Sequence, residues 1–456
     1  MQYLKSGFAT ESFTLPEFAL RVISPKRFYF QFLTFQPIIR SPLMQDSSRA
    51  SIRDVFSLPV IVAALGYFVD IYDLVLFSIV RVPSLKAFGL EGKALIDYGV
   101  FLLNMQMIGM LVGGILWGWL GDVKGRLKIM FGSILIYSLA NIANGFVTSL
   151  EAYAVLRFIA GVGLAGELGA GITLVSEILH TKVRGYGTML VASIGVTGAI
   201  LANAVATHYD WKTAFFIGGG LGLLLLVARF KVSESGMFQT MESKAAVSKG
   251  NLLALFTSRD RFFRYLNSIL IGVPIWFVVG VLITFSPEFA TALGISGQVS
   301  AGNAVMFCYL GLVCGDLSSG LLSQVLKSRK KAVLVFLVLI IASITLFFRQ
   351  GPATPALFYA ICAALGFSGG YWAIFVTVAA EQFGTNLRAT VATTVPNFVR
   401  GMVVPITMLF QYTRGQFGLE GGAIIVGVIC LVAAFVSLAA LEETFHKDLD
   451  YFEEFL

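Results

Sequence analysis

The chain has few charged residues: Asp, Glu, Lys and Arg make up 13% of its 456 residues, whereas a soluble globular protein carries about 25%. So little charge cannot cover the surface of a soluble protein of this length. An ordinary soluble enzyme, a disordered chain and a nucleic-acid-binding protein are therefore excluded. Hydrophobic residues make up 57% and the mean hydropathy is +0.82. The partner that fits this composition is the lipid bilayer.

Residues that bind metals or nucleotides are scarce as well. The three histidines are scattered, and the four cysteines lie in apolar runs without a Cys-x-x-Cys pair. We expect buried free thiols and no metal site. Neither a Gly-x-x-x-x-Gly-Lys-Ser/Thr loop nor a Ser/His constellation occurs, so we expect no ATP hydrolysis, no cofactor and no enzymatic activity. The residues concerned are His180, His208, His446, Cys308, Cys314, Cys362 and Cys430.

Long apolar runs are what the sequence does contain. A membrane-spanning helix needs about 20 mostly apolar residues, and twelve runs meet that requirement. A polar stretch from Lys231 to Arg261 separates the first six from the last six. The predicted spans are 57–80, 97–121, 129–148, 151–176, 185–207, 211–230, 262–286, 299–326, 332–348, 355–380, 389–413 and 421–441.

Lys and Arg are unequally divided between the two sides that these spans define. One side holds 17 of them and the other side holds six. Because Lys and Arg accumulate in cytoplasmic loops, the first side is predicted to be cytoplasmic, together with both termini. We expect an integral protein of the bacterial inner membrane. The first 43 residues contain four prolines and no spanning run or clear signal peptide. We therefore expect Met44 to be the native start, with 1–43 as upstream sequence or a loose arm.

The two halves of the chain repeat each other. Gly118 recurs as Gly320, 202 residues later, and the pair Glu177 and Arg184 recurs as Glu381 and Arg388, 204 residues later. Tandem halves are typical of transporters that bind substrate between the halves. The predicted fold class is an all-α membrane protein with twelve transmembrane helices in two pseudo-symmetric six-helix bundles. Its predicted parts are an arm (1–56), an N-terminal bundle (57–230), a cytoplasmic linker (231–261), a C-terminal bundle (262–441) and a cytoplasmic tail (442–456).

One loop carries a recognisable signature. Gly118–Lys128 reads GWLGDVKGRLK and resembles the pattern Gly-x-x-x-Asp-x-x-Gly-Arg-x-Lys of the major facilitator superfamily, whereas the second copy has Gln324 in place of the acid. The ending Leu441-Glu-Glu-Thr is similar to the Pro-Glu-Thr ending of its sugar-porter-like branches, without the proline. The resemblance covers about 57–445 and implies a secondary transporter close to the metabolite–proton, phosphate–proton and sugar-porter-like symporters.

Acidic residues lie deep inside the first span. Tyr67, Asp70 and Asp73 are spaced by three and share one helix face. A carboxylate near mid-bilayer costs about 2.5–3.5 kcal/mol, so such residues normally face a polar cavity and can carry protons. The other interpretation is a permanent salt bridge to a neighbouring helix. The resemblance implies that Arg157 pairs with Asp73 and that Glu167 is the buried acid of the span at 151–176.

Arg400 is a candidate ligand for a substrate anion. It lies about 14 residues into its span, next to Asn397, where a cation needs an anionic partner. That partner is either a substrate carboxylate or phosphate, or a fixed acid such as Asp316. Trp276, Tyr371 and Trp372 are candidate cavity walls, although aromatic side chains are also common at membrane interfaces. Tyr67, Asn397, Trp276 and Trp372 are predicted to bind the substrate together with Arg400.

Charged residues at the cytoplasmic ends of the spans are candidates for a gate. We expect Asp122 to lie near Thr385 and Asn386, and Arg126 and Arg388 to reach Glu177. Such pairs would form when the inner side closes and break when it opens; ordinary loop salt bridges are compatible with the same pattern. The predicted gate residues are Asp122, Arg126, Glu177, Arg184, Glu381 and Arg388.

The predicted function is the import of a small anionic metabolite together with protons, by alternating access. The expected partners are the substrate, protons and the bilayer, with a monomeric chain and no nucleic acid. Two other functions stay open: proton-exchanging efflux of a small organic compound, and a membrane receptor or sensor that transports nothing. The span at 185–207 reads Gly195-Val-Thr-Gly198-Ala and lacks the Gly-Pro pair of the exporter branches, which disfavours efflux.

Overall fold

The computed structural model describes residues 55–124, 126–179, 184–233, 252–447 and 453. The regular structure of this part is helical, and it contains no strand. The expectations for residues 1–43, for a start at Met44 and for most of the linker concern residues outside the described part, so they stay predictions.

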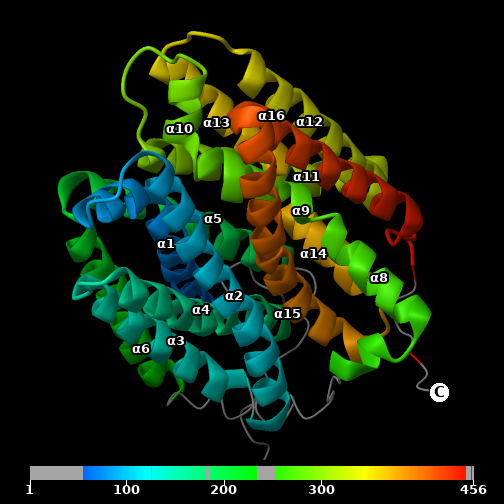
Figure 1. Cartoon of the computed structure of the whole chain (residues 1–456). Helices are drawn as coiled ribbons and strands as arrows, with labels where there is room; N and C mark the ends of the chain where they lie inside the picture. Colours follow the sequence, from blue (N-terminus) through cyan, green and yellow to red (C-terminus); the bar gives the residue numbers. More distant parts are fainter. Residues whose placement is uncertain (1–54, 125, 180–183, 234–251, 448–452, 454–456) are drawn as a thin grey trace, which may run out of the picture. The chain divides into compact units, whose positions relative to one another are not determined.

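Six long helices form the first half of the described chain (Figure 1). Each contains one of the first six apolar runs. Gly89, with a φ of 78°, lies between the first two helices, and Gly92, with a φ of 54°, begins the second. α2 packs against α4, α1 against α5, and α3 against both α4 and α6. The helices are α1 (Leu58–Ala87), α2 (Gly92–Lys124), α3 (Arg126–Gly145), α4 (Leu150–Ile178), α5 (Arg184–His208) and α6 (Trp211–Ser233).

The second half is built from more and shorter helices. A short 3-10 helix, η2 (Leu252–Phe256), precedes it, and a π-helical segment, η3 (Val278–Ile283), lies inside it. Its α-helices are α8 (Arg259–Leu270), α9 (Val273–Phe277), α10 (Ser286–Ala292), α11 (Ala301–Leu326), α12 (Arg329–Arg349), α13 (Pro355–Gly369), α14 (Trp372–Glu381), α15 (Thr385–Gly401) and α16 (Val403–Ala440).

Three of the predicted spans in this half are interrupted. The span at 262–286 breaks between α8 and α9, where Gly272 precedes Pro274, and the span at 355–380 breaks at Gly370. The span at 389–413 is interrupted at Met402, between α15 and α16. Proline fits the first turn of a helix but cannot continue one, and glycine adds conformational freedom. Gly418, with a φ of 74°, divides α16 into the last two spans.

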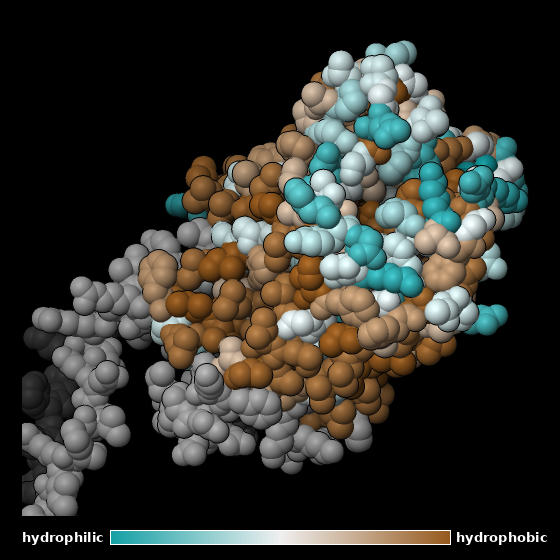
Figure 2. Space-filling view, turned by 90° about the vertical axis from the view of Figure 1, so that its left-hand side faces the viewer, coloured by the Kyte–Doolittle hydropathy of each residue, from teal (hydrophilic) through white to brown (hydrophobic). Residues whose placement is uncertain are grey.

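The helices have the length and the surface of membrane spans. Eight apolar helical stretches of the described residues are long enough to cross a bilayer; one of them, Thr390–Ala440, contains both spans on either side of Gly418. With α3, α4 and α5 they make twelve. Large apolar side chains such as Leu224, Val338 and Val436 are exposed. Figure 2 shows apolar side chains over most of one face, with hydrophilic ones gathered at one end.

Glycines allow the helices within each half to pack closely. A Cβ on Gly198 of α5 would lie 2.1 Å from the carbonyl oxygen of Phe68 in α1. A Cβ on Gly366 of α13 would lie 1.8 Å from the carbonyl oxygen of Cys308 in α11. Small residues permit such backbone contacts in membranes. The two halves meet where α5 and α1 pack against α11, and where α2 packs against α15 and α16.

Candidate functional site

A buried cation and a buried acid face each other between the two halves. Arg400 of α15 is 1% exposed and Asp70 of α1 is fully buried. One Nη of Arg400 lies 3.8 Å from a carboxylate oxygen of Asp70, too far for a hydrogen bond. Among the described residues, Nε and the other Nη of Arg400 have no hydrogen-bond partner. A buried guanidinium with unused donors can bind an additional anion.

Two tryptophans lie beside this guanidinium. The Arg400 carbon Cζ is 5.8 Å from the ring centroid of Trp276 in α9 and 5.8 Å from that of Trp372 in α14. The two indole rings meet edge to face, with centroids 6.2 Å apart. Aromatic faces stabilise a cation and offer apolar surface to the body of a ligand. The structure therefore brings together Arg400, Trp276 and Trp372, three of the residues predicted to bind the substrate; that role stays a prediction.

Tyr67 belongs to the same cluster. Arg400, Asp70 and Asp316 all interact electrostatically with its hydroxyl. Tyr309 of α11, which the sequence analysis did not single out, interacts with Arg400, Asp70 and Tyr67. The ring of Tyr67 packs directly against the backbone of α5 at Gly195, where an added Cβ would overlap with Cδ1 of the ring. Gly195 thus leaves the space that Tyr67 occupies.

We expect Gly195→Ala to displace the Tyr67 ring and to lower the free energy of unfolding by about 1–3 kcal/mol, the usual cost of overpacking. Gly220→Ala is the matched control, because nothing lies within 4 Å of a Cβ at that position of α6. Thermal denaturation of the purified variants measures the difference. Equal melting temperatures for the two variants would contradict the predicted crowding.

Asn397 lies one turn before Arg400 but makes a different contact. Its side-chain amide donates to the carbonyl oxygen of Ala165 in α4, at 3.2 Å, and its Cβ packs against Gly114 of α2. Asn397 therefore links the two halves, and neither of these contacts is to the aromatic cluster around Arg400. Its predicted role in substrate binding stays a prediction.

Asp316 does not pair with Arg400, the fixed-partner alternative that its position in the sequence left open. One of its carboxylate oxygens accepts the backbone N–H of Ala373 at 3.1 Å, whereas the ion-pair partner of Arg400 in the structure is Asp70. Asp316 reaches across from α11 because Gly315 and Gly370 let α11 approach the break before α14. Its carboxylate caps the start of α14.

A second buried polar cluster surrounds Asp73 and is formed by residues of the first half. Arg157 of α4 donates to Oδ1 of Asn141 at 2.9 Å and to Gln106 at 3.4 Å. It also lies over the Phe215 ring, 4.8 Å from the centroid. The direct Asp73–Arg157 pair that the resemblance implied is not formed in the structure, since neither Asp73 oxygen has a hydrogen-bond partner among the described residues.

Asn141 stands between the two charged groups. It accepts from Arg157, and its side chain approaches Asp73 without a hydrogen bond of good geometry. Asp73 is 2% exposed and Arg157 is 1% exposed, so both charges are removed from water. The predicted alternation of Asp73 and Arg157 between a paired and an unpaired state stays a prediction. Glu167, predicted to be the third acid, has its backbone in α4, but its side chain lies outside the described part.

Polar contacts also join the two halves at the ends that the distribution of Lys and Arg predicts to be outer. Nη2 of Arg81 in α1 donates to both carboxylate oxygens of Glu288 in α10, at 2.6 and 2.8 Å. Arg81 is fully buried, and its Cζ lies 4.4 Å from the Phe285 ring centroid. Arg414 of α16 pairs with Asp97 of α2 at 2.8 Å.

The Arg81–Glu288 pair was not predicted from the sequence. Both residues lie at the outer end of the first span of their half, and they are 207 residues apart, close to the offset of the repeat. Opposite charges at equivalent positions of two repeats were the available signal. Ser78, one turn deeper on α1, and Thr284, which follows η3, are also hydrogen bonded to each other, at 3.1 Å.

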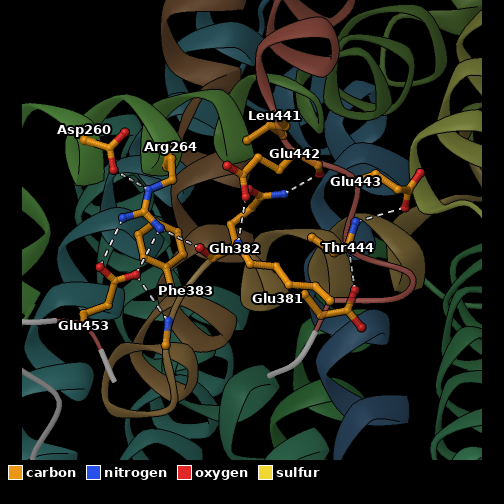
Figure 3. Close-up of polar contacts among 12 residues, drawn as sticks. Asp260, Arg264, Glu381, Gln382, Phe383, Leu441, Glu442, Glu443, Thr444 and Glu453 are labelled. Carbon is orange, nitrogen blue, oxygen red and sulfur yellow. Dashed lines mark hydrogen bonds and ion pairs between the residues drawn. The ribbon is translucent and has the colours of Figure 1, made fainter. Parts of the chain in front are cut away.

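The predicted gate falls partly outside the described part. Asp122, Arg126, Glu177 and Arg184 have described backbones, but their side chains are not described. Glu381 accepts a hydrogen bond from Thr444 at 2.7 Å (Figure 3). It also lies 3.5 Å from Arg329. Arg388 donates to the carbonyl oxygen of Phe383 at 3.3 Å. In the second half, therefore, Glu381 contacts Thr444, which follows the last helix, and Arg329 at the start of α12. The role of all six residues as a gate stays a prediction.

The Leu441-Glu-Glu-Thr ending connects helix ends on this side. Glu443 accepts the N–H groups of Arg329 and Lys330, at 2.8 and 3.2 Å, and thus caps α12. Partial burial raises its pKa, but hydrogen bonds from Ser328 and from these N–H groups outweigh it and hold the pKa of Glu443 below its ordinary value. Its stabilising effect is therefore present at neutral pH and is lost as the pH falls through the lowered pKa.

Comparison with known proteins gives a consistent result. The family model described as the Major Facilitator Superfamily matches residues 63–403. The niacin transporter of Acinetobacter baylyi is 26% identical over 423 residues, which cover 85% of this chain and 94% of that protein. The cis,cis-muconate transport protein of the same organism is 26% identical, with 85% and 94% covered.

A solved structure shares the fold. The crystal structure of a D-xylose–proton symporter matches with a TM-score of 0.61 at 16% identity, covering 86% of this chain and 99% of that one. Together with the helices described above, this match confirms the predicted fold class: an all-α membrane protein with twelve transmembrane helices in two pseudo-symmetric six-helix bundles.

Proposed function

The chain belongs to the major facilitator superfamily, a family of membrane transporters and not of enzymes, and on that premise we propose that it imports a small organic anion together with protons. The anion is a compact metabolite whose carboxylate binds Arg400 and whose apolar body packs against Trp276 and Trp372. Translocation follows alternating access, in which the site between the two halves opens to one side of the membrane at a time.

The observation that carries this proposal is the state of Arg400. It is a buried cation with two unused donor atoms, loosely paired with Asp70 and flanked by two indole rings. Leaving a buried charge so weakly compensated is costly unless an anion completes the site. Relatives named for niacin and for cis,cis-muconate support a small organic acid as the ligand.

Two carboxylates on one face of α1 provide the coupling. Asp70 faces Arg400, so a substrate carboxylate competes with it for the guanidinium, and protonation of Asp70 removes that competition. Asp73 faces the cluster around Arg157 in the first half. Proton binding to these acids and anion binding to Arg400 therefore favour each other, which is what symport requires.

The contacts at the predicted outer ends support a state that is closed on that side. Arg81–Glu288, Arg414–Asp97 and the hydrogen bond between Ser78 and Thr284 all cross between the halves there. With the cytoplasmic side as predicted, this state would release the anion inward. Opening the outer side requires these contacts to separate.

Uptake of radiolabelled nicotinate, benzoate and cis,cis-muconate into proteoliposomes, with and without an inward proton gradient, tests the proposal. Stimulation of uptake by the gradient is expected for at least one anion. Accumulation driven by an outward-directed gradient would favour efflux, and binding without any flux would favour a receptor.

We expect Arg400→Lys to weaken transport of that anion roughly 10- to 100-fold, because an ammonium group offers a point charge in place of the planar guanidinium fork. Lys331→Arg, at an exposed position of α12, is the matched control and should leave uptake unchanged. Wild-type uptake by Arg400→Lys would show that the anion does not bind to Arg400.

A further inference from the structure

Each of the two tryptophans beside Arg400 follows a helix break of the second half. Trp276 lies in the short helix α9, which restarts after Gly272, and Trp372 is the first residue of α14, which restarts after Gly370. The position of a side chain at the start of such a helix depends on the contacts that fix the start of the helix. The geometry around Arg400 therefore depends on what holds the two breaks.

The restart of α14 is held by a different helix. Tyr371, at the N-cap position, contributes no side-chain cap. Asp316 of α11 supplies the missing acceptor, because its carboxylate receives the N–H of Ala373 at 3.1 Å. A carboxylate at this position satisfies a backbone donor and interacts favourably with the positive end of the helix dipole.

The approach of α11 to the break is close. A Cβ on Gly370 would lie 2.4 Å from Cα of Gly315 and 2.6 Å from the backbone nitrogen of Asp316. Neither backbone can move toward the other, so this contact fixes the position of the Asp316 carboxylate relative to the first turn of α14.

The two breaks are also joined to each other. The Tyr371 hydroxyl donates to the carbonyl oxygen of Ile271 at 2.8 Å. Ile271 is the C-cap residue of α8, immediately before Gly272, and Tyr371 is fully buried. This hydrogen bond ties the restart that carries Trp372 to the restart that carries Trp276.

We propose that Asp316 and Tyr371 are positioning residues that hold the tryptophans edge to face beside Arg400, so that the site selects carboxylates attached to a flat ring. This inference rests on the proposed function for the binding of an anion at Arg400. A flat ring stacks against an indole face over its whole area, whereas a puckered ring of equal size touches only part of it. Loss of either hydrogen bond loosens the aromatic wall and removes this preference.

The test compares Asp316→Ala with Asp316→Asn in the full-length protein. Asn is as good a helix cap as Asp, so it retains the acceptor and removes only the charge, whereas Ala removes both. Proteoliposome uptake of benzoate and of cyclohexanecarboxylate gives KM and kcat for a flat and a puckered ring. For Asp316→Ala we expect the KM for benzoate to rise about tenfold with little change in kcat. Asp316→Asn should keep the wild-type preference.

Tryptophan fluorescence provides a readout that needs no transport. Asp316→Ala should shift the emission of the ligand-free protein to the red and increase its quenching by acrylamide, and the shift should vanish in a Trp372→Phe background. If the wild type transports neither acid while this shift is seen, the positioning role stands and the proposed function fails. If Asp316→Ala matches Asp316→Asn in both emission and KM, the inference is overturned.

Tyr371→Phe covers the case in which Asp316→Ala does not fold. It keeps the ring and removes only the hydrogen bond to Ile271. Tyr371→Phe should also shift the tryptophan emission to the red, and this shift should vanish in a Trp276→Phe background. Its KM for benzoate should rise, whereas its KM for cyclohexanecarboxylate should not change. Wild-type values for both measurements would overturn the role of Tyr371.

Discussion

Arg81→Gln is expected to hold the transporter open on its predicted outer side and to reduce transport at least tenfold. The wild-type guanidinium is fully buried and donates to both oxygens of Glu288. Removing one partner of a buried ion pair costs about 3–5 kcal/mol, because the other charge is left uncompensated. That cost falls only on the outward-closed state, since Glu288 regains water when the halves separate. The population ratio of the two states should therefore shift more than 100-fold.

A cysteine at position 78 reports this change. Ser78 is buried one turn below Arg81, against Thr284 of the other half. In a background with Cys314→Ser, because Cys314 is the exposed native thiol in the described part of the chain, Ser78→Cys should react slowly with a membrane-impermeant maleimide. Adding Arg81→Gln should make it react much faster.

The chain contains a matched control for this experiment. Arg414 and Asp97 also join the halves at 2.8 Å, but Asp97 is 41% exposed. Exposed ion pairs contribute about 0–1 kcal/mol. Arg414→Gln should therefore leave both labelling and transport nearly unchanged. If Arg414→Gln has the same effect as Arg81→Gln, burial of the Arg81 pair is not what closes the outer side.

The fold could be predicted from the sequence further than the site could. Membrane helices are set by apolar runs of fixed length, and the repeat can be read from loop motifs such as Gly118 and Gly320. The breaks before α9 and α14 were not predicted, because Gly370 and Pro274 lie inside runs whose mean hydropathy is high enough for a single span. A hydropathy profile does not reveal a helix break that is stabilised by contacts with another helix. Asp316 of α11 makes such a contact with the start of α14.

Charge pairing was the least predictable part. The deep positions of Asp70, Asp73, Arg157 and Arg400 were evident from their spans, but their partners depend on helix rotation, which the sequence does not specify. Arg400 pairs with Asp70, whereas the sequence suggested Asp316 as a fixed acid. Only the three-dimensional arrangement shows that Asn141 lies between Arg157 and Asp73.

Asp73→Asn is expected to abolish accumulation of the substrate while preserving its exchange. Each coupled proton supports about tenfold accumulation per unit of pH gradient, since one pH unit corresponds to 1.36 kcal/mol. Asp73 is buried, its oxygens have no hydrogen-bond partner among the described residues, and Arg157 is held by Asn141 and Gln106. Asparagine resembles the protonated carboxyl in size and charge, so the variant should behave as a carrier that is permanently protonated at this position.

The measurement follows proton uptake and substrate flux in the same vesicles. For Asp73→Asn the accumulation ratio should fall to about one, while exchange of internal for external substrate continues; Arg157→Gln should be similarly uncoupled if the two residues alternate as a pair. Asp70→Asn is the comparison, because Asp70 faces Arg400 and its loss should change substrate affinity first. If Asp73→Asn still accumulates substrate against its gradient, the coupling proton is carried by Asp70 or Glu167, and the cluster around Arg157 serves only to hold α1 to its neighbours.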